Sequence, residues 1–282
     1  MRINHNISSM ITQGSLFRTN RSLGKSLEKL STGLRINRAS DDAAGLAISE
    51  NLRTQVRGTA QAQRNALDGI AALNIAEGAA NEVSDILQRM RELAVQSAND
   101  TLTSTERSYT NQEFGQLEDE ISRIATVTNY NRMDLLSAAT TNRFGGGSGS
   151  VLWVDANSTV GQDSITITID TLTTGTDGLG IATDNLNSQT GAQNALTSVD
   201  VAIDSVNSMR ANIGAHVNRL EHAVNNLMIS ETNQQAAESN IRDVNFAAET
   251  ADFTKNQILT QSATAMLAQS HLIPSSILGL LG

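Results

Sequence analysis

The chain contains no cysteine and a single proline in 282 residues, and only 3% of its residues are aromatic. The lack of cysteine excludes disulfides and thiolate metal sites. Because the one proline is Pro274, almost the whole chain lacks the strongest helix breaker. With so few aromatic rings, leucine, isoleucine, valine and alanine must fill the core, as is typical of thin helical bundles.

Signals for secretion and for membrane insertion are also missing. The start of the chain lacks the apolar stretch of about 7 to 15 residues that a cleavable signal peptide needs. No run of residues reaches the roughly 18 apolar positions of a membrane span. We therefore expect a chain that remains in the cytosol, or leaves it by a route that reads no such signal.

Charge is unevenly distributed along the chain. The net charge is −9, but residues 1–40 hold seven basic groups and one acid. A basic end is a candidate nucleic-acid surface. Solvated helix faces are the better interpretation, because leucines at helical spacing run between these charges and interleaved aromatic rings are missing. The sequence therefore predicts no nucleic-acid partner.

Residues that carry chemistry are sparse. The pair Asp41-Asp42 has no further metal-ligand cluster near it, and His216 and His222 are six residues apart, which points them to different helix faces. The glycine-rich stretch 145–149 lacks the Lys-Ser/Thr that completes a phosphate-binding loop. We expect no cofactor, no metal site and no enzymatic activity.

Apolar residues near the N-terminus recur at intervals of three and four, which predicts one apolar stripe along a helix. The stripe consists of Ile3, Ile7, Met10, Gly14 and Phe17, followed by Leu23, Leu27, Leu30 and Leu34. An isolated helix of this kind is marginal in water. We therefore expect it to stay unfolded until it packs against a partner.

Residues 66–94 carry a second stripe at the same spacing, inside a helix predicted over about 42–99. Ser40 is expected to cap this helix, and Asp41-Asp42 to lie at the positive end of its dipole. A third stripe over residues 199–227 is about as long. The two long stripes are therefore predicted to lie side by side as a coiled coil.

Shorter elements complete the pattern. Residues 103–106 match a capping box that opens a helix reaching about residue 128. Residues 151–154 and 164–169 predict a β-hairpin too small for a core of its own. The last helix is predicted over 241–272, with Pro274 ending it. The fold class predicted is mainly α: a long antiparallel helical or coiled-coil bundle of the N- and C-terminal segments, with a small β-hairpin insertion.

Several blocks of this sequence resemble bacterial flagellin. Near the N-terminus they are residues 30–37 (LSTGLRIN), 41–48 (DDAAGLAI) and 87–99 (LQRMRELAVQSAN). Near the C-terminus they are residues 218–222 (NRLEH), 237–244 (AESNIRDV), 253–261 (FTKNQILTQ) and 265–269 (AMLAQ). The blocks follow the order of that family and cover both ends of the chain.

The resemblance implies a structural subunit of the flagellar filament, exported unfolded by the flagellar secretion apparatus. Residues 1–40 and 240–282 would form an inner layer of terminal helices, disordered in the monomer. Residues 41–144 and 190–239 would form a rod-like helical bundle, and residues 145–189 a short variable segment. A hook–filament junction or minor filament protein is the alternative function, because it shares the paired terminal helices.

The same resemblance implies that the terminal helices carry self-assembly. The residues expected there are Ile3, Ile7, Met10, Leu23, Leu27, Leu30, Leu34, Phe253, Ile258, Leu259, Met266 and Leu267. A repeated head-to-tail contact whose rotation does not close produces an open helical filament. The principal partner is therefore expected to be another copy of the chain.

Further partners are implied by the resemblance: an export chaperone on the C-terminal helix, the filament cap and the hook-junction proteins. Some members are sensed by Toll-like receptor 5, and the contact positions correspond to Arg89, Leu93 and Glu113. Solvated charges at Arg89 and Glu113, and packing at Leu93, are the alternative interpretation. The expected location is a bacterial flagellum, external or, in a spirochaete, periplasmic, without membrane insertion.

Removal of residues 1–35 should abolish polymerisation, because it deletes one of the two terminal helices that are expected to pair. The rod-like bundle should remain folded and keep its thermal unfolding transition by circular dichroism. Normal filaments of the truncated chain in electron micrographs would show that the assignment of the ends is wrong.

Overall fold

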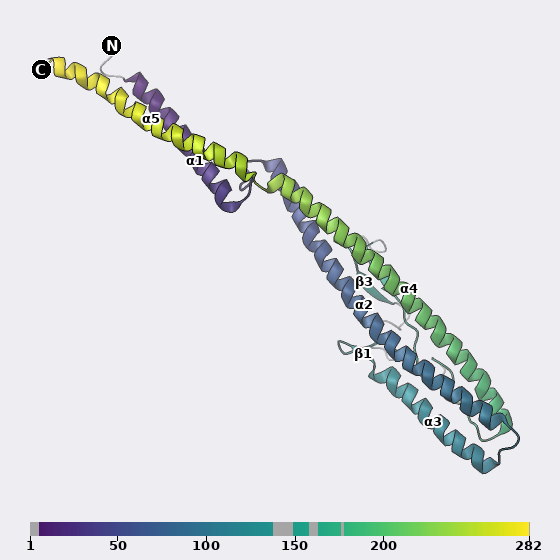
Figure 1. The fold of residues 1–282 in the computed structure, drawn as a ribbon. Coiled ribbons are helices and arrows are strands. Elements are labelled where there is room, and N and C mark those ends of the chain that lie inside the picture. The colour runs from purple at the N-terminus through teal and green to yellow at the C-terminus, as the bar shows by residue number, and fades with distance from the viewer. Residues whose placement is uncertain (1–5, 138–148, 158–162, 176–177, 282) are drawn as a thin grey trace. The chain divides into compact units, whose positions relative to one another are not determined.

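The computed structural model describes residues 6–137, 149–157, 163–175 and 178–281, with side chains as far as Leu272. In this part of the chain the helices are α1 (Ile7–Thr32), α2 (Ala43–Ala98), α3 (Ser104–Val127), α4 (Gln189–Arg242) and α5 (Phe246–Leu281) (Figure 1). The strands are β1 (Asn129–Tyr130), β2 (Met133–Asp134), β3 (Ser150–Trp153) and β4 (Ser164–Ile167). The predicted mainly helical fold with a small hairpin is confirmed.

The chain divides into two compact units. The terminal unit comprises residues 1–54 and 232–282, and the rod unit comprises residues 55–231. The divisions fall inside α2 and α4, whereas the predicted layers divide near residues 40 and 240, where the helices are interrupted. In the terminal unit, α1 and α5 run antiparallel and side by side (Figure 1).

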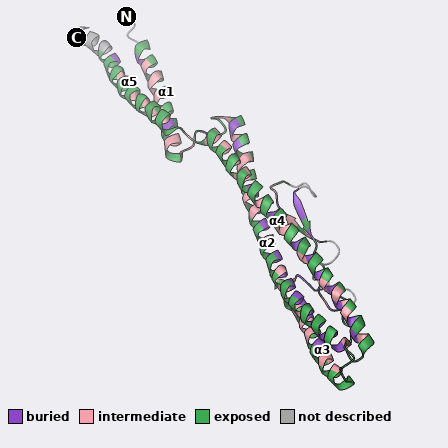
Figure 2. Cartoon of the chain, turned by 45° about the vertical axis from the view of Figure 1, so that its right-hand side comes forward, coloured by how far each residue is buried: buried purple, intermediate pink, exposed green. Residues whose placement is uncertain are grey.

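The rod unit holds the apolar core, and both predicted long stripes line it. On α2 it buries Leu73, Leu87 and Met90, and on α4 it buries Val206 and Met209, all at most 1% exposed. The two helices pack against each other as predicted. Helix α3 adds Phe114 and Ile121 to the same cluster. The buried positions are therefore concentrated along α2, α3 and α4 (Figure 2).

Helix ends follow local capping chemistry. The predicted capping box of α3 is confirmed: the Glu106 N–H donates to the Thr103 side chain, and the Glu106 carboxylate accepts from the Thr103 N–H. The prediction for α2 is wrong by two residues. Its cap is Asp42, whose carboxylate accepts from the Gly45 N–H at 2.9 Å. Asp41 instead pairs with Lys25, and Ser40 lies in the preceding turn.

The predicted end of the last helix is also wrong, because α5 continues past Pro274 to Leu281. Its start is shifted too, since α4 extends to Arg242 and Asn245 caps α5. A proline removes one helix donor, which frees the carbonyl four residues before it. That carbonyl, on Ser270, accepts from the Asn6 side chain at 2.8 Å.

The interruptions between α1 and α2 and between α4 and α5 pair with each other. Gly33 ends α1 in the left-handed conformation at φ 73°, which glycine adopts without strain. Leu34 and Asp243 then form an antiparallel bridge. The Arg35 N–H donates to the Arg242 carbonyl at 2.6 Å. Backbone groups released at one interruption are therefore satisfied by the other.

The predicted hairpin forms from β3 and β4, with Val151 opposite Thr166. It packs on α2 where the helix presents two glycines: Gly58 lies against Ala156, and Gly69 against the Leu152 side chain. Between them, the Asn65 amide donates to the Trp153 carbonyl at 3.2 Å. The small insertion is thus stabilised by the rod helices on which it was expected to depend.

A substitution pair on α2 tests this docking. Gly78→Ala should raise the free energy of unfolding by about 1 kcal/mol, because alanine is the better helix former and nothing lies within 4 Å of the added carbon. Gly58→Ala gains the same propensity, but its Cβ would lie 2.6 Å from that of Ala156. The free energy of unfolding of Gly58→Ala should therefore be about 1–3 kcal/mol lower than that of Gly78→Ala. Equal stability in urea unfolding would contradict the docking.

Candidate self-assembly surface

The seam between α1 and α5 is lined by small and medium side chains. Its buried residues are Ser9, Ser26 and Ser270. Half-buried apolar residues accompany them: Leu16, Leu23 and Leu30 on α1, and Phe253 and Leu267 on α5. Lys29 and Glu249 form an ion pair across the seam at 3.4 Å. The two helices are therefore paired, but they enclose no large apolar core.

The lack of a core is pronounced. Among the described residues of the terminal unit, Ile36 is the only buried apolar side chain, and it lies between α1 and α2. By contrast, the rod unit buries apolar side chains along its whole length (Figure 2). Packing of an apolar face supplies most helical stability in proteins. The seam alone is a weak basis for ordering two long helices.

The predicted assembly residues divide between the seam and the outside. Leu23, Leu30, Leu34, Phe253 and Leu267 are half-buried, and Ile3 lies outside the described residues. The exposed members are Ile7, Met10, Leu27, Ile258, Leu259 and Met266, each 45% to 65% exposed. The sequence predicted one apolar stripe per helix. The structure distributes these residues over more than one face.

Helix α1 carries a second apolar stripe opposite the seam. Ile7, Met10, Ile11 and Phe17 share that face, and Phe17 is 71% exposed. On α5, Ile258, Leu259 and Met266 likewise lie away from the seam. We call these two sets the outer stripes. Several large apolar side chains exposed on one helix face are typical of an interaction site.

Charged residues surround the interruptions between the helices. Arg242 pairs with Glu50 at 2.7 Å, and this guanidinium lowers the pKa of the Glu50 carboxyl. Lys25 pairs with Asp41 at 3.2 Å and lowers the pKa of that carboxyl through its hydrogen bond. The basic residues near the N-terminus are thus partly used in pairing within the terminal unit.

The three positions implied for receptor contact have different environments. Arg89 bonds Glu113 at 2.8 Å and Glu92 at 2.9 Å. These carboxylates, Glu113 foremost, raise the pKa of the Arg89 guanidinium. Leu93 is 1% exposed and belongs to the rod core. Arg89 and Glu113 are therefore on the surface, whereas Leu93 packs inside, and receptor contact stays a prediction.

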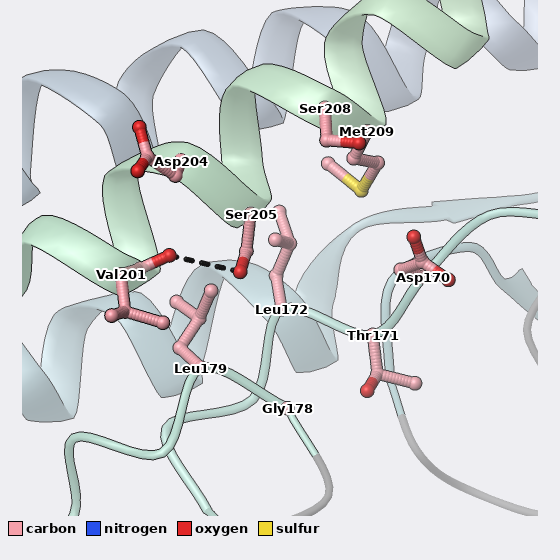
Figure 3. Close-up of a pocket in the computed structure, with 10 residues that line it drawn as sticks. All are labelled: Asp170, Thr171, Leu172, Gly178, Leu179, Val201, Asp204, Ser205, Ser208 and Met209. Carbon is pink, nitrogen blue, oxygen red and sulfur yellow. Dashed lines mark hydrogen bonds between the residues drawn. The ribbon is translucent and has the colours of Figure 1, made fainter. Parts of the chain in front are cut away.

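An open depression of about 650 Å³ lies beside α4 in the rod unit (Figure 3). Its polar lining includes Asp170, Asp204 and Ser205. The Ser205 hydroxyl donates to the Val201 carbonyl at 2.9 Å, so it is engaged within the helix (Figure 3). In the part of the chain that the structure describes, no group of three His, Cys, Asp or Glu residues is placed to hold a metal ion. Within the same ranges, no helix has the length and apolar run of a membrane span.

Paired terminal helices with bare outer stripes, joined to a well-packed rod, define a structural protein that associates with copies of itself. Family comparison specifies the class. Residues 3–141 match the bacterial flagellin N-terminal helical region, and residues 196–281 match the bacterial flagellin C-terminal helical region. The chain belongs to the bacterial flagellin family.

Individual relatives support the same conclusion over their full length. Flagellin FlaB2 of Treponema pallidum (strain Nichols) is 44% identical over 289 residues, and flagellin of Bacillus subtilis (strain 168) is 42% identical over 310 residues. Each alignment covers 100% of both chains. The protein is a structural, non-enzymatic subunit of the flagellar filament. This decides against the junction component that the sequence left as an alternative.

A solved structure agrees at the level of the fold. A chain assigned as a flagellar hook-associated protein of Vibrio parahaemolyticus matches with a TM-score of 0.57 and 19% identity. The match covers 72% of this chain and 100% of that one. At this identity the likeness concerns the fold alone.

Two carboxyls in the rod unit lie in unfavourable surroundings. Partial burial raises the pKa of Glu118 on α3, and the neighbouring charges of Asp119 and Asp184 raise it further. Burial also raises the pKa of Asp184, against the effect of a hydrogen bond from the Ser198 hydroxyl. No motif in the sequence marks this pair, because it depends on how α3 meets the segment before α4.

The raised pKa values of Glu118 and Asp184 make the stability of the rod unit depend on pH. A carboxyl whose pKa is higher in the folded than in the unfolded chain destabilises the fold when it is ionised, so stability falls as pH rises through that range. Glu118→Gln should therefore raise the melting temperature of the rod at pH 7 by roughly 1–2 °C. Its advantage should shrink towards pH 4, where the carboxyl is protonated.

Glu120→Gln is the matched control on the same helix. Arg123 bonds Glu120 at 2.6 Å and lowers the pKa of its carboxyl. Its ionised form is favoured by folding, so this substitution should slightly lower the melting temperature at pH 7. Shifts of the same sign for both variants in calorimetric scans would contradict the electrostatic assignment.

Proposed function

We propose that the filament is held together by the outer stripes of α1 and α5, which become buried between neighbouring copies. The observation that carries this proposal is that both terminal helices leave large apolar side chains on faces turned away from their mutual seam. A two-helix pair has no third element to cover those faces. Another copy of the chain supplies the cover.

In this arrangement residues 1–40 and 240–282 form the inner layer, and residues 41–144 and 190–239 the surrounding rod layer. Residues 145–189 form the short variable segment. The terminal residues remain disordered in the monomer, because the seam buries too little apolar surface to offset the loss of chain entropy. Ordering then occurs on addition to the polymer, as in other cases of coupled folding and binding.

Export in an unfolded state follows from the same weakness, since the terminal helices present little stable structure to undo. An export chaperone would cover the exposed apolar side chains of α5, such as Ile258 and Met266, before assembly. The filament cap and hook-junction proteins would meet the same outer stripes at the two ends of the polymer. The exposure of these stripes supports all three partners.

Contact with Toll-like receptor 5 would use the ion-paired surface of Arg89 and Glu113. Both side chains are accessible in the rod unit, at 50% and 46% exposed. Leu93 would act from beneath, by packing that holds Arg89 and its helix in place. A charge reversal at Glu113 would therefore weaken receptor contact more than a conservative change at Leu93.

Electron microscopy of the purified full-length chain, after addition of a precipitating salt or filament seeds, tests the assembly proposal directly. Long tubes of uniform width are expected. Persistent monomers, under conditions in which a relative polymerises, would refute the role of the outer stripes as a self-association surface.

Phe17→Asp isolates the outer stripe of α1. The ring is 71% exposed in the subunit, so folding should be unaffected, whereas a carboxylate buried in an interface is strongly unfavourable. The monomer concentration that remains at equilibrium with filaments should rise at least tenfold, by roughly 1.4 kcal/mol or more. Ser22→Asp places the same charge on an exposed position of α1 that lies beyond the stripe and is not three or four residues from any of its members, and it should change that concentration little. Equal effects of the two substitutions would argue against the stripe.

A further inference from the structure

The α5 helix lacks one backbone hydrogen bond, at the turn that contains Pro274. Pro274 lies inside α5, which runs from Phe246 to Leu281. Proline has no N–H, so the helical hydrogen bond to the carbonyl of Ser270 cannot form. Ser270 is 7% exposed, which leaves little access for water. The carbonyl therefore needs another donor.

Asn6 supplies that donor from the other end of the chain. Its side-chain Nδ2 donates to the Ser270 carbonyl oxygen at 2.8 Å, across 264 residues of sequence. The oxygen of the same amide accepts from the Ser9 N–H at 3.1 Å and so caps α1. One side chain thus begins α1 and completes the bonding of α5. Only a side chain with both a donor and an acceptor can do this.

A second contact lies beside the first. The Ser9 hydroxyl is 3.3 Å from Nε2 of His271, the residue that follows Ser270. Ser9 is also buried, at 9% exposed. The two small serines permit a close approach of the helices, so that the short Asn6 side chain reaches the backbone of α5.

Near the interruptions, the Leu34–Asp243 bridge and the Lys29–Glu249 ion pair already align α1 with α5. Towards the start of α1, the seam encloses no large buried side chain, so packing alone specifies the alignment of that end weakly. In paired helices, a single polar contact in the seam can fix the register. The chain has one proline, and thus one α5 carbonyl released in this way. A slip by one helical turn would bring Asn6 against a carbonyl that already accepts a helical N–H.

We propose that Asn6 and Pro274 act together as the register determinant at the free end of the terminal helices, where α1 begins. The proline leaves the Ser270 carbonyl of α5 without a helical donor. When α1 packs against α5, the alignment in which the Asn6 side chain donates to that carbonyl is favoured over the others. This inference rests on the proposed burial of the terminal helices in the filament, since they are ordered there. It adds which residues decide how the two helices align.

Asn6→Asp separates the two roles of the side chain. Aspartate caps helices as well as asparagine does, but at neutral pH it has no donor for the Ser270 carbonyl and places a negative charge beside it. In seeded polymerisation of the full-length chain, the residual monomer concentration measured by sedimentation should rise about tenfold, the usual scale for a buried carbonyl left without a donor.

Pro274→Ala restores the helical N–H, so the Ser270 carbonyl no longer depends on Asn6. In that background, Asn6→Asp should change the residual monomer concentration by less than about twofold. Asn245→Asp is the matched control, because Asn245 caps α5 by accepting from the Ala247 and Ala248 N–H groups. It should also stay within about twofold of the unmodified chain.

Each of the other possible outcomes counts against a specific claim. The same increase from Asn6→Asp with proline or alanine at 274 would reduce Asn6 to an ordinary helix cap and overturn the proposal. No increase with proline present would overturn it as well. Pro274→Ala alone should raise the residual monomer concentration, because the chain loses the released carbonyl that Asn6 selects, and an unchanged concentration would also overturn the proposal. Failure of the unmodified chain to polymerise in the same assay would count instead against the proposed function.

Discussion

A pair of helices can cover only one face of each member, and the organisation of this protein depends on that constraint. Where α1 meets α5, the covered face is narrow and lined by serines and half-buried leucines. Apolar side chains that find no room there remain outside. Because burial of apolar surface is the main favourable contribution to folding, the proposed assembly would supply order that the α1–α5 seam of a single copy does not.

The rod unit meets the same constraint within one chain. Helices α2 and α4 are also a long antiparallel pair, but α3 packs against them with Phe114 and Ile121, and the hairpin adds Ile165 and Ile167. The glycines at 58 and 69 let that hairpin approach the surface of α2 closely. These additional elements close a core rich in alanine and leucine, in which Phe114 is the one fully buried aromatic ring among the described residues. The rod unit is thus stabilised by contacts within one copy, whereas the proposed assembly stabilises the terminal unit through contacts between copies.

Periodicity and local chemistry predicted most of the fold. The spacing of apolar residues indicated the long helices, Thr103 and Glu106 indicated the cap of α3, and alternation indicated the β3–β4 hairpin. Periodicity did not reveal which face of a helix a neighbour covers, so Phe17 and Leu23 belonged to one predicted stripe although they lie on different faces. The errors at Ser40 and Pro274 have a similar origin. At the start of α2 the carboxylate of Asp42, two residues after Ser40, is the acceptor that caps the helix. At Pro274 the released Ser270 carbonyl finds its donor on Asn6, 264 residues away, which no short stretch of sequence reveals.

The two outer stripes also make the ends of a polymer chemically different from its wall. Along the wall, each copy has neighbours on every side that the helical arrangement provides. The last copy added has lost that symmetry, because the faces awaiting the next copy are bare. In the proposed assembly, the growing tip is therefore where the outer stripes remain exposed to water. Growth at such a tip is favoured over side-by-side clumping of finished fibres, and a tip without a cover is the natural point at which unrelated apolar material would adhere.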